Sequence, residues 1–338
     1  MIPRKPDEDG EADIDSADEA LLDMLGLSSL NVADDHDDDC HPDPQKLTSS
    51  EISILVESNQ LSKDYVTNSV CIFPPELSMR SEHMRKITDE LVWGGEKMQA
   101  DRTYETIQVY NNGAIEQRRT LTRLENFVDS HKAWKQLCHG YLRDTVSTIL
   151  GRRMVLYKEK LNLKPPGGSG FAPHLDSPSL KVALKEDGPQ TFVTVMVAID
   201  DMTEQNGCLR ICKGTWNEDK HVELIEPEMD GNPDAGGRAG AIEDAIAENL
   251  SFDNIVCKGG SIVAFNGWAP HRSAPNMSPF SRRAVFLTYN PESEGEFRER
   301  YYAKMDGMRN AWRFGLANHQ QQLEDEMIES NALATVPK

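Results

Sequence analysis

Two histidines and an aspartate provide the residue types of a metal site. His174 and Asp176 stand two positions apart within residues 171–176, FAPHLD. On an extended strand, residues i and i+2 point to the same face, so both side chains can reach one ion. His271, at the end of the segment GWAPH, can supply a third ligand. Two imidazoles and one carboxylate leave three positions of an octahedral ion open, which is typical of non-haem Fe(II) that binds a cosubstrate and O2.

The segments around these residues strengthen a signal that is weak by itself. The chain has nine histidines in 338 residues, so a lone His-x-Asp pair is interpreted more simply as a surface turn. However, a PPGGSG loop at 165–170 precedes the pair, and a hydrophobic stretch at 192–199 follows it. His271 lies just past another strand-like segment, GGSIVAF, and Ser281-Arg282-Arg283 follows ten to twelve residues later. A basic residue placed there can hold a dicarboxylate.

At these residues the chain resembles the phytanoyl-CoA dioxygenase family of Fe(II)/2-oxoglutarate oxygenases. The resemblance covers roughly residues 48–305, and the wording is most similar to the branch that contains 2-aminoethylphosphonate dioxygenases. It implies that His174, Asp176 and His271 bind iron. Leu175 stands where the family usually has Gln, and strand geometry turns it away from the metal. The matching segments, in family order, are KEKLNLKPPGGSGFAPHLD (158–176), VAIDDMTEQNGCLRICKGTW (197–216), GGSIVAFNGWAPHRSAPN (259–276) and SRRAVFLTYNP (281–291).

The resemblance also implies how the cosubstrate 2-oxoglutarate is held. Arg282, eleven residues after His271, is expected to pair with its far carboxylate, because a guanidinium binds a carboxylate bidentately and stays charged. Ser273, two residues past His271, can add a hydrogen bond. Strand parity turns Arg283 to the opposite face, as a surface or interface cation. The implied reaction consumes O2, releases succinate and CO2, and hydroxylates or oxidatively cyclises an unactivated C–H bond, with ascorbate expected to help.

Composition argues against several classes of partner. The net charge is −20, and the first 45 residues hold 15 Asp or Glu against two basic residues. Such a chain is a poor ligand for nucleic acid, whose phosphates need Lys and Arg, and for anionic membranes. No apolar run approaches the roughly 18 residues of a membrane span, and no signal peptide opens the sequence. The six cysteines lack zinc-type spacing, so we expect reduced thiols and a cytoplasmic location.

The chain divides into three predicted regions. Residues 1–46 form an acidic tail that is expected to be disordered, 47–315 the dioxygenase domain, and 316–338 a C-terminal helix and tail. An acidic, glycine-containing stretch at 217–256 predicts a lid-like insertion. The apolar island at 20–27 is either a partner-binding helix or, more simply, a transient helix without a partner.

The hydrophobic pattern predicts a mainly β protein with flanking helices. The spacing of the later strands, short and separated by turns, is typical of a jelly roll, that is, a cupin-like double-stranded β-helix. Helical patterns occupy 48–59, 79–93, 131–150, 297–305 and 316–329, with a shorter one at 241–250. Strands are predicted at 70–73, 106–110, 154–163, 192–199, 208–212, 261–265 and 284–289.

The substrate is indicated only by charge. Lys158, Lys160, Arg210 and Arg272 lie on or beside strands that can line the pocket, which favours a small anionic or zwitterionic substrate. Scattered surface charges explain them equally well. Three functions remain open: an Fe(II)/2-oxoglutarate hydroxylase, an oxygenase-fold protein that binds or regulates through its acidic tail, and a cupin-like metalloprotein without 2-oxoglutarate. The complete ligand triad favours the first function over the second, and Arg282 favours it over the third.

Overall fold

The fold is known from a computed structural model that describes residues 60–94, 98–111, 114–221, 224 and 239–307. The predicted acidic tail with its apolar island, the helix at 48–59 and the helix at 316–329 lie outside these residues. Within the described part, no helix has the length and apolar character needed to cross a lipid bilayer.

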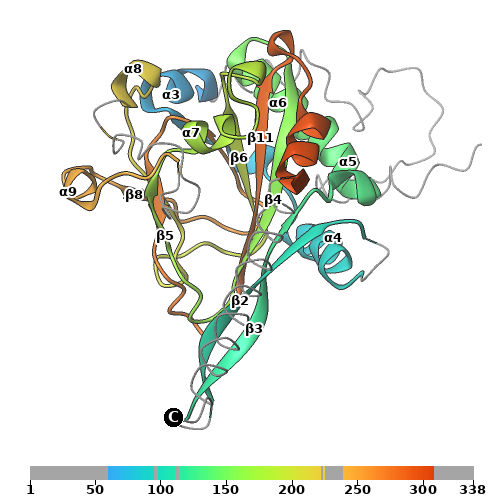
Figure 1. Ribbon diagram of the computed structural model, residues 1–338, viewed down its shortest axis with the longest axis vertical. Coiled ribbons are helices and arrows are strands. Elements are labelled where there is room, and N and C mark those ends of the chain that lie inside the picture. Colours follow the sequence, from blue (N-terminus) through green and yellow to red (C-terminus); the bar gives the residue numbers. More distant parts are fainter. Residues whose placement is uncertain (1–59, 95–97, 112–113, 222–223, 225–238, 308–338) are drawn as a thin grey trace, which may run out of the picture.

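A large antiparallel sheet forms the framework of the protein (Figure 1). Its edge strands are β1 on one side and β2, which forms a hairpin with β3, on the other. In the middle, β11 pairs with both β4 and β6. In spatial order the strands are β1 (Val70–Ile72), β9 (Ile262–Asn266), β6 (Val193–Ala198), β11 (Arg282–Pro291), β4 (Met154–Lys164), β3 (Ala114–Glu125) and β2 (Asp101–Asn111).

A second antiparallel sheet of four short strands faces the large one (Figure 1). Its strands are, in spatial order, β5 (Phe171–His174), β10 (His271–Ser273), β7 (Leu209–Ile211) and β8 (Asp253–Asn254). Met196 and Ala284 of the large sheet join Leu209 and Ile211 of the small sheet in one buried apolar cluster. Apolar side chains therefore fill part of the space between the sheets, and the predicted jelly-roll fold is confirmed.

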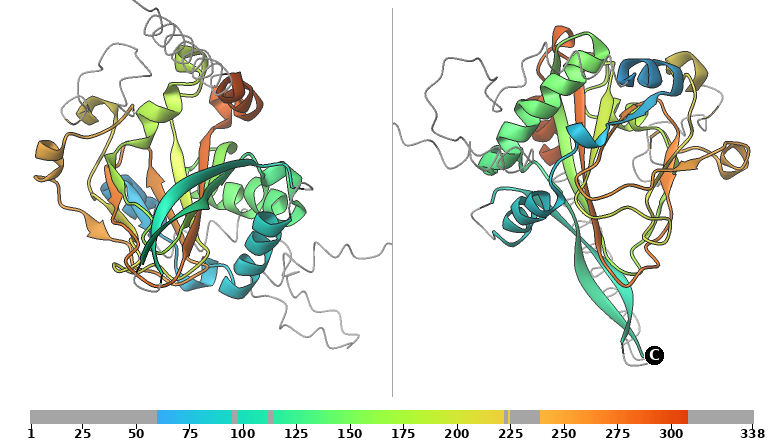
Figure 2. Two further views of the ribbon diagram at one scale, coloured as in Figure 1. Left: turned by 60° about the horizontal axis from the view of Figure 1, so that its bottom comes forward. Right: turned by 180° about the vertical axis from the view of Figure 1, so that it is seen from behind.

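Helices cover the outer face of the large sheet (Figure 2). Because side chains alternate along a strand, Val195, Val197 and Leu287 point to this outer face and join the largest apolar cluster. The covering helices contribute their buried sides to the same cluster: α3 (Leu61–Asn68), α4 (Ser81–Trp93), α5 (Lys132–His139) and α6 (Tyr141–Leu150). Short 3-10 turns occur at Pro75–Leu77, Val128–Ser130, Lys185–Asp187 and Glu292–Glu294.

The predicted single helix over 131–150 is wrong in one respect, because Gly140 divides it into α5 and α6. Gly140 has φ −111° and ψ −107°, outside the helical region. A Cβ at this position would lie 2.5 Å from the backbone oxygen of Gln136. The break therefore depends on glycine, although the apolar spacing continues across it.

The predicted strand at 106–110 is part of β2, the first strand of a much longer hairpin. β2 pairs with β3 along its whole length, from Asp101 opposite Glu125 to Asn111 opposite Ala114. β3 was not predicted, because its sequence is dominated by charged and polar residues. Asn112-Gly113, between the two strands, is a residue pair typical of two-residue hairpin turns and was the available signal. The hairpin projects from the body of the protein (Figure 1), and its base pairs with β4.

The 217–256 insertion contributes β8 to the small sheet. The predicted helix at 241–250 shrinks to the four residues of α9 (Asp244–Ala247), and α8 (Glu218–His221) begins the insertion. Leu175 donates a backbone hydrogen bond to Gly240 (2.8 Å), and Ile242 donates one to Pro173 (3.1 Å). Residues 240–242 of the insertion therefore run beside β5, next to His174. The helix predicted at 297–305 is observed at 298–307.

Candidate metal centre

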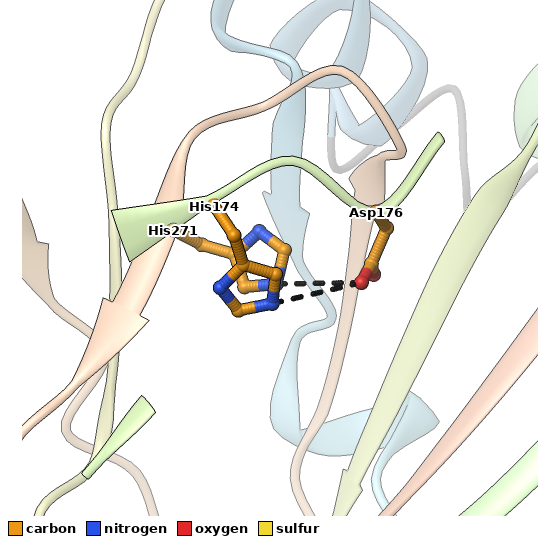
Figure 3. A group of neighbouring side chains, drawn as sticks. All are labelled: His174, Asp176 and His271. Atoms are coloured by element: carbon orange, nitrogen blue, oxygen red, sulfur yellow. Dashed lines mark ion pairs between the residues drawn. The ribbon is translucent and has the colours of Figure 1, made fainter. Parts of the chain in front are cut away.

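Two neighbouring strands of the small sheet bring the two histidines together. β5 and β10 are antiparallel, and His174 and His271 are direct partners in their register. The ring centroids lie 4.2 Å apart, and both rings point toward Asp176 (Figure 3). Strand pairing therefore joins two segments that are far apart in the sequence.

Asp176 is the first residue of helix α7 (Asp176–Lys181) and not part of the strand. Leu175 still has extended geometry, with φ −109° and ψ 139°, so residues 174 and 176 point to one side as the spacing predicts. Leu175 points to the other side, where it is fully buried with Ile242, Ala247 and Trp268.

The donor atoms of the three side chains converge on one point. Oδ1 of Asp176 lies 3.8 Å from Nε2 of His174 and 3.7 Å from Nε2 of His271 (Figure 3). Oδ2 accepts a hydrogen bond from the Thr194 hydroxyl at 2.9 Å, which leaves Oδ1 turned to the imidazoles. Among the described residues, this is the one group of three or more His, Cys, Asp or Glu with metal-binding geometry.

Backbone carbonyls determine which ring nitrogen carries the proton. Nδ1 of His174 lies 2.7 Å from the Ala172 oxygen, and Nδ1 of His271 lies 3.0 Å from the Ala269 oxygen. A carbonyl only accepts hydrogen bonds, so each neutral ring is protonated at Nδ1. Both Nε2 lone pairs consequently face the carboxylate, which is the arrangement of a metal-ligating histidine.

The electrostatics of the site favour the ligand forms of His174 and Asp176. Burial and the neighbouring His271 lower the pKa of His174 to about 3, against the opposing effect of Asp176, so the ring is neutral at pH 7. Burial alone would raise the pKa of Asp176. His271, Lys160, His174 and the Thr194 hydroxyl outweigh it and hold that pKa well below its usual value. Neutral imidazoles beside an ionised carboxylate are the states that bind a cation.

Arg282 and Ser273 also lie between the sheets. Arg282, the first residue of β11, is 4% exposed and donates a hydrogen bond to the Gly207 carbonyl, while its Nε has no partner among the described residues. Ser273 shares β10 with His271 and accepts a hydrogen bond from the Phe171 amide at 3.2 Å.

Arg283 points to the opposite face of β11, as strand parity predicts. Its Nε and one terminal nitrogen bind the two oxygens of Asp200 at 2.8 and 3.0 Å. Its other terminal nitrogen forms an ion pair with Asp89 on α4 at 2.5 Å. Arg283 therefore joins the large sheet to its covering helix.

The expected pocket cations separate into two groups. Lys158 and Lys160 share the inner face of β4, where Lys160 is close enough to Asp176 to influence its pKa. Arg210 and Arg272 are register partners on the outer face of the small sheet, and Arg272 stacks on the ring of Phe252 at 4.3 Å. The expectation that these two arginines line the pocket is wrong, because His271 and Ile211 occupy the inward positions.

Sequence analysis missed two neighbours of the site. Thr194 holds Asp176, and Lys164, 5% exposed at the end of β4, lies opposite Arg282 in the strand register. Lys164 has the same strand parity as Lys158 and Lys160, and this was the available signal.

His131 caps α5 and His139 lies 3.9 Å from Asp129, so neither belongs to the metal site. The side chain of His221 and the DDHDDDCH run at 34–41 lie outside the described residues.

Two of the proteins most similar to this chain act on phosphonates. The chain is 40% identical over 185 residues to the 2-aminoethylphosphonate dioxygenase of uncultured bacterium HF130_AEPn_1, covering 54% of this chain and 64% of the relative. It is 32% identical over 182 residues to the methylphosphonate hydroxylase of Gimesia maris, covering 54% and 63%. The matches thus span less than two thirds of these two relatives. Dioxygenase lolE1 of Epichloe uncinata is 30% identical over 213 residues, covering 62% of this chain and 73% of the relative.

Solved structures share the fold. EctD from S. alaskensis, solved with 2-oxoglutarate and 5-hydroxyectoine, superposes with a TM-score of 0.50 and 19% identity, covering 70% of this chain and 76% of EctD. EctD with bound Fe gives a TM-score of 0.50 and 18% identity, covering 70% and 77%. Residues 74–284 match the family model described as phytanoyl-CoA dioxygenase (PhyH). With this match over most of the described chain, the protein belongs to the phytanoyl-CoA dioxygenase family.

Proposed function

We propose that the protein is an Fe(II)/2-oxoglutarate-dependent dioxygenase that hydroxylates a small zwitterionic metabolite. An aminophosphonate is the first candidate substrate. One observation carries the proposal. The two imidazoles and one carboxylate share the space between the sheets with a buried arginine whose Nε has no partner among the described residues.

The three side chains fit Fe(II) by their chemistry. They offer two imidazole nitrogens and one carboxylate oxygen, all within 4.8 Å of one another. This set leaves coordination positions open for a chelating cosubstrate and for O2. Together, Fe(II), O2 and 2-oxoglutarate would convert a C–H bond to C–OH, with release of succinate and CO2. The protein's part is to bind, orient and shield the reactants.

The residues expected to hold 2-oxoglutarate are Arg282 and Ser273. Both lie on the inner side of their strands, and Ser273 follows His271 by two residues on β10. A carboxylate between them would accept a hydrogen bond from the unpartnered Nε of Arg282 and another from the Ser273 hydroxyl.

The substrate class is inferred from charges on the inner face of β4. The ammonium of Lys160 has no hydrogen-bond or ion-pair partner among the described residues, and its contact is the ring of Phe286 at 5.3 Å. Burial lowers the pKa of Lys160 to about 8, with Asp176 opposing that shift. An anionic group of the substrate would give this ammonium a partner close to the metal ligands.

The neighbouring residues offer the opposite charge. Glu125 of β3 forms an ion pair with Lys158 at 3.2 Å, and both side chains are mostly buried. The Lys158 ammonium also lies 5.3 Å from the centre of the Tyr301 ring. A carboxylate beside an aromatic ring is a suitable partner for a substrate ammonium group. The name of the 2-aminoethylphosphonate dioxygenase agrees with a substrate that carries both charges, and the name of the methylphosphonate hydroxylase agrees with the anionic group alone.

The test is succinate release by the purified protein with Fe(II), ascorbate and 2-oxoglutarate. The panel includes 2-aminoethylphosphonate, methylphosphonate, small amino acids, betaines and acyl-CoAs. We expect release above the substrate-free rate with an aminophosphonate, loss of most of it in Lys160→Met, and no effect of Lys258→Met, whose side chain is 87% exposed. Stimulation only by acyl-CoAs would contradict the substrate class, and a protein that binds Fe(II) but not 2-oxoglutarate would contradict the reaction class.

A further inference from the structure

Two buried cations stand side by side at one end of the space between the sheets. Lys164 ends β4 and Arg282 begins β11, and they are direct partners in the register of these strands. They are 5% and 4% exposed. Both approach the Gly207 carbonyl, Lys164 with Nζ at 3.4 Å and Arg282 with a terminal nitrogen.

No described carboxylate forms an ion pair with either cation. Apart from the effect of Arg282 on Lys164, thiols have the largest charge influence on the two cations: Cys208 influences both residues, and Cys257 influences Arg282. Burial raises the pKa values of both thiols, so they are neutral near pH 7. Asp200 acts on Arg282 only weakly, because both of its oxygens bind Arg283. Two adjacent buried charges without a counter-ion are unfavourable, so the geometry favours an anion beside them.

The hydrogen bonds of Ser273 show where the anion belongs. Its Oγ accepts one hydrogen bond from the Phe171 amide at 3.2 Å and a second from Nζ of Lys164 at 2.8 Å. A hydroxyl oxygen has two lone pairs and one proton. With both lone pairs occupied, the Ser273 proton must be donated to another acceptor.

Backbone packing keeps this arrangement compact. Nζ of Lys164 also donates to the Ala274 carbonyl at 2.7 Å. The glycine-rich loop approaches the same segment so closely that a Cβ at Gly170 would lie 2.3 Å from the backbone oxygen of Ser273. A Cβ at Gly207, where φ is +68°, would lie 2.1 Å from the Ala274 oxygen. The Lys164 ammonium therefore lies next to closely packed backbone, with little exposure to solvent.

We propose that Lys164 is a positioning residue for the dicarboxylate cosubstrate: its ammonium directs the Ser273 hydroxyl proton toward the bound carboxylate and supplies, beside Arg282, the second positive charge of the site. The inference rests on the proposed function, because it takes 2-oxoglutarate as the ligand. It adds a residue to the Arg282 and Ser273 pair implied by the sequence.

The proposal has a consequence for pH. Burial and then Arg282 lower the pKa of Lys164 to about 7, with Cys208 opposing them. A bound carboxylate favours the charged ammonium and raises this pKa, so binding above pH 7 takes up a proton. A neutral amine would accept the Ser273 proton and turn the donor away from the ligand. Affinity for 2-oxoglutarate should therefore fall as the pH rises above 7, by up to about tenfold per unit.

The test is anaerobic calorimetry of 2-oxoglutarate binding to the Fe(II)-loaded protein between pH 6 and 9. Repeating it in buffers of different ionisation enthalpy measures proton uptake. Wild type should show the pH-dependent loss of affinity, with proton uptake near pH 8. Lys164→Arg should bind with little pH dependence and no uptake. Lys164→Met should bind at least tenfold more weakly at pH 6.5, also without uptake, whereas Lys258→Met should match wild type.

The outcomes separate this inference from the proposed function. A wild type that binds 2-oxoglutarate with a pH-independent dissociation constant, or a Lys164→Met protein with the wild-type constant and slope, overturns the role of Lys164 alone. If Lys164→Met does not fold, the pH profile of Lys164→Arg against wild type decides the question. A wild type that binds Fe(II) but no 2-oxoglutarate at any pH overturns the proposed function and this inference with it.

Discussion

His174 and His271 face each other across β5 and β10 as direct register partners, with their ring centroids 4.2 Å apart. Direct partners in an antiparallel pair have the closest side chains in a sheet. The pairing of two short strands therefore sets the distance between the two imidazoles, and any change that shifts this register will separate them.

Removing a ligand should abolish iron binding without unfolding the protein. Asp176→Asn keeps the shape of the side chain but removes the negative charge between two imidazoles. We expect wild type to bind one Fe(II) per chain and Asp176→Asn or His271→Ala to bind none, as measured by metal analysis after gel filtration. Asp201→Asn is the matched control, because Asp201 is a half-exposed aspartate that pairs with Lys258. Full iron content in the Asp176 variant would disprove the ligand assignment.

The two adjacent arginines should affect different properties, Arg282 the affinity for 2-oxoglutarate and Arg283 the stability of the fold. Losing a shielded charge-assisted contact costs about 2–5 kcal/mol, so Arg282→Ala should raise the dissociation constant for 2-oxoglutarate at least about thirtyfold. Arg283→Ala should leave that constant nearly unchanged.

Because Arg283 binds Asp200 and Asp89, its removal should instead lower the unfolding free energy by about 1–3 kcal/mol. Calorimetric titration and denaturant unfolding of both variants measure the two effects. Equal losses of 2-oxoglutarate affinity in both variants would mean that both side chains contact the ligand, contrary to strand parity.

Gly240 should couple the insertion to the metal centre. Its φ is +85°, and a Cβ there would lie 2.4 Å from the backbone oxygen of Leu175, the residue between two proposed ligands. Gly240→Ala should therefore destabilise the protein by about 1–3 kcal/mol and weaken Fe(II) binding. Gly307→Ala is the control, because no atom of the described residues lies within 4 Å of the added Cβ, apart from its chain neighbours and its own helix backbone. Melting temperature and Fe(II) affinity are the measurements, and wild-type values for both in Gly240→Ala would refute the coupling.

Glu159 should matter for stability rather than for chemistry. It is fully buried on the outer face of β4, accepts hydrogen bonds from the amides of Phe127 and Val128, and binds Arg298 through both oxygens. Removing one partner of a buried pair is costly, so Glu159→Gln should cost about 3 kcal/mol in unfolding free energy, although Arg298 keeps its ion pair with Asp129.

The control for this variant is Glu292→Gln, which breaks an exposed pair with Arg153 and should cost less than about 1 kcal/mol. Denaturant unfolding compares the two variants. If both variants lose the same small amount of unfolding free energy, the proposed stabilising role of the buried Glu159 carboxylate is wrong.

Local patterns in the sequence were enough for much of the fold. The continuous hydrophobic stretch at 192–199 predicted β6, and the apolar spacing that ends before Gly94 predicted α4, because each depends on neighbouring residues alone. Long-range packing decided other elements. The break at Gly140 is invisible in the apolar spacing, and β3 forms although it is mostly polar, since it pairs with β2 and β4.

The site divides in the same way. Residue types and spacing singled out His174, Asp176 and His271, because i and i+2 geometry is a local property, and the family resemblance singled out Arg282. Only the tertiary structure decided that Lys164 lies opposite Arg282, that Thr194 holds Asp176, and that Arg210 and Arg272 face outward. These relationships depend on strand register and on which sheet face is covered. Both are set by contacts between segments far apart in the chain, and no local pattern encodes them.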